Sequence, residues 1–91
     1  MVSQKEVHQN AVNHLFWQHP INIPEKLCLI HSEISEALEA LRLENSIGEE
    51  LADAVIRIMD LAEYLDIDLN QEIFIKHNIN KTRPIKHNKK F

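Results

Sequence analysis

The sequence predicts an all-α fold, and two observations support that fold class. The 91 residues include one glycine and three prolines, whereas an all-β fold needs frequent turn residues. Apolar residues recur at steps of three and four, the spacing of one helix face. No apolar run approaches the roughly 20 residues that span a bilayer. The length is that of a single domain over residues 1–91, which we expect to be a compact four-helix bundle.

The first two helices are expected at residues 2–18 and 24–44. The His19-Pro20 step ends the first, and Pro24 suits the first turn of the second, where its missing N–H has no partner to lose. The second helix carries a stripe that should face the core: Leu27, Ile30, Ile34, Leu38 and Leu41. Cys28 lies beside this stripe and is expected to be buried. A single cysteine forms no internal disulfide, which fits a reducing cytoplasm.

The third helix is expected after Ser46, an N-cap whose capping-box partner would be Glu49. Its main apolar stripe is Leu51, Val55, Ile58, Ala62 and Leu65. Further apolar residues surround most of this helix, so we expect it to associate with a second copy of the chain. The fourth helix should run over residues 69–81 with Asp68 or Asn70 as its cap. Pro84 prevents its continuation, so residues 82–91 are expected to be an extended basic tail.

Two acidic pairs at helical spacing are the chemically most informative feature. Glu33 and Glu36 lie on the second expected helix, and Glu50 and Asp53 lie on the third. Residues three apart share a helix face, so two helices folded back on one another would direct four carboxylates at one volume. Such crowded charges need a compensating cation, and hard oxygen ligands suit Mg²⁺ or Mn²⁺. We therefore expect these four residues to be metal ligands.

A basic segment follows the acidic pairs, within a chain of net charge −4. Lys76, Asn80 and Arg83 are spaced four and three apart, so they share one helix face if the fourth helix extends that far. Arginine and lysine bind phosphate oxygens, and asparagine can donate a hydrogen bond to one. These residues either bind a phosphorylated substrate or form an ordinary charged helix end.

The ordered set of these motifs resembles the MazG-like nucleotide pyrophosphohydrolases. The resemblance covers roughly residues 27–91 and includes Glu33-x-x-Glu36, Glu50-x-x-Asp53 and Lys76-x-x-x-Asn80-x-x-Arg83-Pro84. It implies an enzyme that cleaves nucleoside triphosphates to monophosphate and pyrophosphate with Mg²⁺, in a bundle built from at least two chains. Many members carry a further glutamate where this chain has Ser32.

The chemistry and spacing of individual residues suggest their roles. Glu36 is the expected base that activates water, with Glu33 as a second catalytic carboxylate. Trp17 could stack on a base and Asn13 could read its edge, with core packing as the alternative for the tryptophan. Lys26 is expected in solvent. Asp60 is expected to pair with Arg57 at helical spacing.

Other functions remain as alternatives for this sequence. A related enzyme, phosphoribosyl-ATP pyrophosphohydrolase, would use a similar bundle, and a helical oligomeric binding module would need no catalysis. Nucleic-acid binding is disfavoured, because the chain is acidic and its basic tail is short. The six histidines are scattered, which argues against a zinc site. We expect a cytoplasmic homodimer or homotetramer that binds neither nucleic acid nor membrane.

Overall fold

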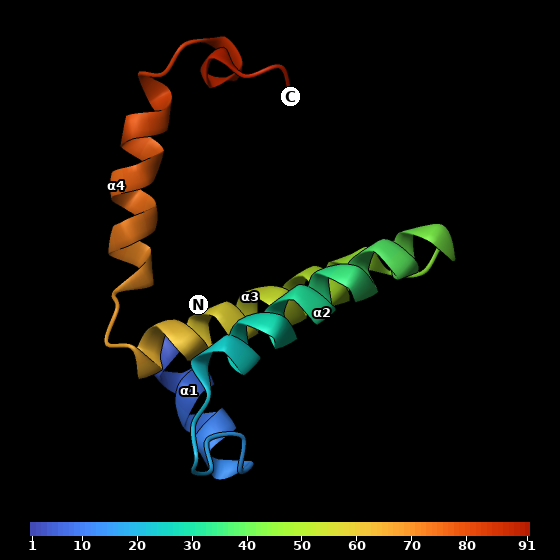
Figure 1. Cartoon of the computed structure of the whole chain (residues 1–91), viewed down its shortest axis with the longest axis vertical. Coiled ribbons are helices and arrows are strands. Elements are labelled where there is room, and N and C mark those ends of the chain that lie inside the picture. The colour runs from blue at the N-terminus through green and yellow to red at the C-terminus, as the bar shows by residue number, and fades with distance from the viewer.

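The computed structural model describes all 91 residues and contains helices but no strand. The elements are α1 (Gln4–Asn13), α2 (Ile23–Arg42), α3 (Ile47–Tyr64), α4 (Leu69–Lys81) and a short 3₁₀ helix, η1 (Ile85–Asn88) (Figure 1). The predicted all-α class is confirmed, and α4 has the predicted bounds. The tail is not wholly extended, because η1 lies within it. No helix is both long and apolar enough to cross a membrane.

Three of the four helices begin with a side-chain cap. The side chains of Ser3, Asn22 and Asp68 each accept a hydrogen bond from a backbone N–H in the first turn of α1, α2 and α4. These bonds satisfy donors that have no partner inside the helix. Ser46 stands at the N-cap of α3, but its side chain makes no cap hydrogen bond, so the predicted capping box with Glu49 is wrong.

Left-handed residues end the first three helices. Leu15, Glu44 and Asp66 follow α1, α2 and α3 with φ of 68°, 58° and 58°. After each of them, the next N–H returns to a carbonyl in the last turn, as in the 2.8 Å bond from Asn45 to Ala40. This reversal at Leu15 explains why α1 ends at Asn13 and not near residue 18.

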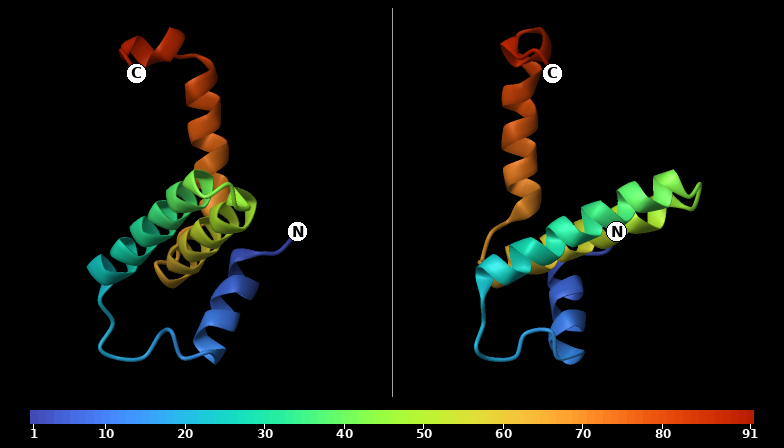
Figure 2. Two further views of the ribbon diagram at one scale, coloured as in Figure 1. Left: turned by 90° about the vertical axis from the view of Figure 1, so that its right-hand side faces the viewer. Right: turned by 45° about the vertical axis from the view of Figure 1, so that its right-hand side comes forward.

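The helices α2 and α3 form a hairpin and lie side by side along most of their length (Figures 1 and 2). Small residues occupy the contact: Ala37, Ala40, Ala54 and Ala62 are all buried. Alanine leaves no bulk between the helices, so their backbones can approach closely. Most residues of the two apolar stripes predicted for the core are exposed instead, and Ala62 is the one stripe residue that is buried. The exposed ones are Leu27, Ile34, Leu38 and Leu41 of α2 and Leu51, Val55, Ile58 and Leu65 of α3. Cys28 is exposed as well, contrary to expectation.

Helix α1 packs against α3 and contributes Val7 to the core, while Leu61 of α3 is buried with it. Gln4 secures the start of α1 to the turn between α3 and α4. Its Nε2 donates to Glu63 Oε1 at 2.8 Å and to the carbonyl of Ile67 at 2.6 Å. Its Oε1 accepts from the N–H of Leu69 at 3.2 Å. One side chain therefore ties three segments together.

Helix α4 stands apart from the other three (Figures 1 and 2) and contains no buried residue. The radius of gyration is 15.6 Å, whereas a compact chain of this length would have about 12 Å. The accessible surface is 7546 Å², compared with about 5,500 Å² expected for a compact monomer of this mass. The predicted compact bundle is therefore formed by α1–α3 only, and α4 is left without cover in the single chain.

Candidate metal centre and adjoining pocket

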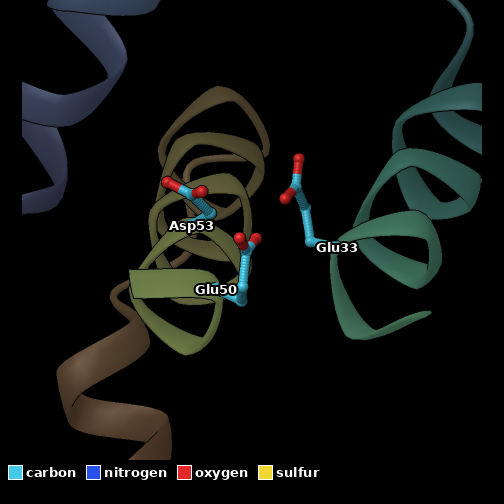
Figure 3. A group of neighbouring side chains, drawn as sticks. All are labelled: Glu33, Glu50 and Asp53. Atoms are coloured by element: carbon cyan, nitrogen blue, oxygen red, sulfur yellow. The ribbon is translucent and has the colours of Figure 1, made fainter. Parts of the chain in front are cut away.

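Three carboxylates converge between α2 and α3. Glu33 projects from α2, while Glu50 and Asp53 project from α3 toward the same space (Figure 3). One oxygen of each lies within 4.8 Å of the others. Glu50 and Asp53 share a face because they are three residues apart. The hairpin then places Glu33 opposite that face, so the sequence prediction of a two-helix acidic cluster holds for these three residues.

Glu33 is the single buried charged residue of the chain, with 8% of its surface exposed. Its Oε1 accepts a hydrogen bond from Nε of Arg57 at 2.7 Å. A buried carboxylate without a partner would be costly, so this ion pair compensates the charge that the fold encloses. The expected pairing of Arg57 with Asp60 is wrong, because Glu33 lies within reach of the guanidinium across the helix interface.

Glu36 lies at the margin of the cluster. It is exposed and does not belong to the group of three whose oxygens approach one another. The negative charge of Glu33 raises its pKa above the usual value, with smaller contributions from desolvation and from the charges of Glu50 and Asp53. The three clustered carboxylates thus act on Glu36, but Glu36 does not join their tight group.

The donor set fits a hard divalent cation. Three carboxylate oxygens from two helices are the kind of ligand that Mg²⁺ and Mn²⁺ prefer, and neither cysteine nor histidine takes part. Arg57 is the single basic side chain in hydrogen-bond contact with the cluster. The cluster therefore keeps an excess of negative charge that a divalent cation would neutralise.

A pocket of about 280 Å³ adjoins the cluster. Glu33 and Asp53 form part of its wall, together with Arg57, Asp60 and Lys26. The rest of the lining is apolar, aromatic or amide in character: Val7, Asn10, Ala11, Phe16, Trp17, Ile56 and Leu61. An apolar space with a few convergent charged groups is typical of small-ligand sites.

Trp17 is held at this pocket by several contacts. Its Nε1 donates to Asp60 Oδ1 at 2.8 Å, and its ring stacks on Tyr64 with centroids 4.3 Å apart. The ammonium of Lys26 lies 4.3 Å from the Trp17 centroid and also donates to the carbonyl of Phe16. Lys26 is therefore half-buried and engaged, not in solvent as expected. Asp60 has a second partner, His8, whose Nδ1 is 2.7 Å away.

The remaining predicted residues lie outside this pocket. Asn13 is exposed at the end of α1 and accepts a hydrogen bond from Gln9 at 2.9 Å. Lys76, Asn80 and Arg83 lie in or just after the second half of α4, which Figure 1 shows leading away from the hairpin. Within one chain the basic set and the acidic cluster are not brought together.

Two polar residues that line the pocket, Asn10 and Arg57, were not predicted as site residues from the sequence. Asn10, one turn before Asn13, reaches the pocket that Asn13 does not. Arg57 lies four residues after Asp53, so it shares the acidic face of α3, and that spacing was a usable signal.

Comparisons of the chain with protein-family models, curated protein sequences and solved structures found no match. The functional assignment therefore depends on these residues themselves.

Proposed function

We propose that this chain is a Mg²⁺-dependent nucleoside triphosphate pyrophosphohydrolase that cleaves (d)NTPs to (d)NMPs and pyrophosphate. The observation that carries the proposal is the convergence of Glu33, Glu50 and Asp53 to within 4.8 Å beside a pocket of about 280 Å³. The carboxylates supply ligands for a cation, and the pocket offers space for a small organic group next to it. The sequence resemblance to MazG-like enzymes supports the same activity.

The proposed site separates ligand binding from proton transfer. Glu33, Glu50 and Asp53 would hold Mg²⁺, which neutralises the triphosphate and lowers the pKa of an attacking water. Glu36 lies beside these residues without joining their tight cluster. It is exposed, so an attacking water can approach its carboxylate. Glu36 is therefore the proposed general base. Glu33 is the second catalytic carboxylate, because it would hold the cation beside Glu36.

The proposed nucleoside position is the pocket lined by Trp17 and Asn10. Trp17 already has Tyr64 and Lys26 against its ring, so it serves as a fixed wall of the pocket. Lys76, Asn80 and Arg83 remain the proposed phosphate ligands. Since α4 leads away from its own cluster, these residues would serve the cluster of a second copy.

An oligomer, either a homodimer or a homotetramer, is part of the proposal. The chain exposes about 2,000 Å² more surface than a compact monomer of its mass would. Large apolar side chains make up part of that surface, including Leu38 and Leu41 on α2 and Ile73 and Phe74 on α4. Obligate homodimers bury 2,000 Å² or more in total and use apolar surface to do so. Association would also give α4 the cover that it lacks.

The test is pyrophosphate release from a panel of NTPs and dNTPs with Mg²⁺. We expect turnover by the wild type and at least about a hundredfold loss in Glu36→Gln and Asp53→Asn, since each removes a group used in the reaction. Phosphoribosyl-ATP belongs in the panel, because its exclusive cleavage would assign the related enzyme class. A folded oligomer without turnover on any substrate would favour a non-catalytic binding module.

A further inference from the structure

We propose that Arg57 couples the metal site to the pocket. In the metal-free protein it neutralises Glu33, and once a divalent cation occupies the cluster its guanidinium binds a phosphate group of the ligand in the pocket. The inference depends on the proposed function for the identity of that ligand as a phosphate ester. In this proposal Arg57 binds phosphate from the same chain that holds the metal, whereas Lys76, Asn80 and Arg83 would come from a second copy.

The guanidinium of Arg57 has N–H donors without a hydrogen-bond partner in the chain. Its Nε donates to Glu33 at 2.7 Å, and the side chain makes no other hydrogen bond within the chain. The two terminal nitrogens are therefore free of protein partners. Arg57 lines the pocket, and its side chain is 33% exposed. Free guanidinium donors at a pocket wall can bind phosphate oxygens in pairs.

The other cation in the pocket is less available. The ammonium of Lys26 donates to the carbonyl of Phe16 and lies over the ring of Trp17. A phosphate would have to remove it from both contacts. The terminal nitrogens of Arg57 have no protein contacts to break, so Arg57 is the pocket cation that can bind an anion directly.

The balance of charge at the pocket makes anion binding dependent on metal. Glu33, Asp53 and Asp60 line it, against the two cations Lys26 and Arg57. An anion entering the metal-free pocket would meet this net negative charge. A divalent cation on the cluster offsets this negative charge, and it also supplies the compensation that Glu33 otherwise draws from Arg57. Metal and phosphate are therefore expected to bind cooperatively, with Arg57 as the link.

The test measures two binding equilibria in the full-length protein, Mn²⁺ alone and pyrophosphate in the presence of saturating Mn²⁺. In Arg57→Gln we expect Mn²⁺ alone to bind several-fold more tightly, because a positive charge beside Glu33 has been removed. Pyrophosphate should bind at least about tenfold more weakly, because a charge-assisted phosphate contact is lost. Arg57→Lys should recover part of the pyrophosphate affinity, since it restores the charge without the planar fork.

Arg42→Gln is the matched control, because Arg42 is exposed and lies 3.9 Å from Glu39, away from the pocket. It should leave both equilibria unchanged. Weaker binding of both Mn²⁺ and pyrophosphate by Arg57→Gln would mean that Arg57 only supports the fold and would overturn the proposal, as would two unchanged affinities. Neither measurement needs turnover. If the wild type cleaves no nucleotide but Arg57→Gln still binds Mn²⁺ more tightly and pyrophosphate more weakly, the role of Arg57 is supported and the proposed enzyme activity is rejected.

Discussion

The indole N–H of Trp17 donates a 2.8 Å hydrogen bond to Oδ1 of Asp60, the same oxygen that lies 2.7 Å from Nδ1 of His8. Asp60 belongs to α3, His8 to α1, and Trp17 to the segment that joins α1 to α2. One carboxylate thus fixes two separate parts of the chain against α3. Because Trp17 lines the pocket, this arrangement also shapes the space beside the acidic cluster.

Replacing Asp60 by alanine should destabilise the fold by about 2 kcal/mol, because the partly buried donor of Trp17 and the ring of His8 both lose their partner. Chemical denaturation followed by tryptophan fluorescence measures this directly. Glu49→Ala, on the same helix and without a side-chain partner, should change stability by less than about 0.5 kcal/mol. Equal effects of the two substitutions would show that Asp60 does not hold Trp17 in place.

The raised pKa of Glu36 predicts how the stability of the metal-free protein depends on pH. The native state keeps a proton on Glu36 that the unfolded chain releases near pH 4.5. Stability should therefore fall as pH rises through 4.5 to the raised pKa, and stay lower above it. Glu36→Gln should remove this contribution and make the metal-free protein more stable than the wild type at neutral pH.

Urea denaturation at a series of pH values tests the effect. Glu44→Gln is the control, because Glu44 is exposed and makes no side-chain hydrogen bond or ion pair. It should follow the wild-type curve. A Glu36→Gln curve that parallels the wild type throughout would mean that the neighbouring carboxylates do not repel Glu36 in solution.

The sequence predicted local structure well where local chemistry decides it. The cap at Asp68, the end of α4 before Pro84 and the spacing of the acidic pairs all depend on residues a few positions apart. The choice of contact faces was predicted poorly. A stripe of leucine and isoleucine indicates a buried helix face, but it does not say whether the same chain or another copy covers it. In this chain alanines are buried along the hairpin, and most of the leucine and isoleucine residues of the stripes are left exposed.

The alanine contact predicts an asymmetry between two positions on α3. Ala54 is 2% exposed against α2, whereas Ala52 is exposed. A leucine at position 54 would force the two helices apart, so Ala54→Leu should cost about 1–3 kcal/mol. Ala52→Leu is the matched control and should stay within about 0.5 kcal/mol. Equal stability of the two variants in denaturant melts would argue against close α2–α3 contact.

Oligomerisation should depend on the exposed stripe of α2. Leu38 is 58% exposed in the single chain, and a charge there would be buried if a second copy covers the stripe. Leu38→Glu should therefore lower the mass measured by light scattering toward that of the 10.7 kDa chain. Ile85→Glu places the same charge in the tail and should leave the mass unchanged. A wild type that is monomeric at high concentration would refute the predicted assembly.

The candidate site was predictable in part for a similar reason. Spacing placed Glu33, Glu50 and Asp53 on facing surfaces, and the structure brings them together. Spacing could not identify the partner of Arg57. Asp60 is three residues away on the same helix, but the carboxylate that Arg57 binds is Glu33 on α2, and sequence spacing does not relate residues of different helices. Nor could it show where the basic residues of α4 lie, since that depends on the direction in which the chain leaves the short turn after Tyr64.

Analysis of the products formed with Mg²⁺ distinguishes a pyrophosphohydrolase from other enzymes that cleave nucleoside triphosphates. Wild-type protein incubated with a nucleoside triphosphate should yield monophosphate and pyrophosphate in equal amounts, and Asp53→Asn should yield neither above background. Removal of Mg²⁺ by a chelator should stop the reaction, because the acidic cluster would lose its cation. Release of nucleoside diphosphate and inorganic orthophosphate would contradict the account, as would the absence of products from a folded wild-type oligomer on every nucleotide tested.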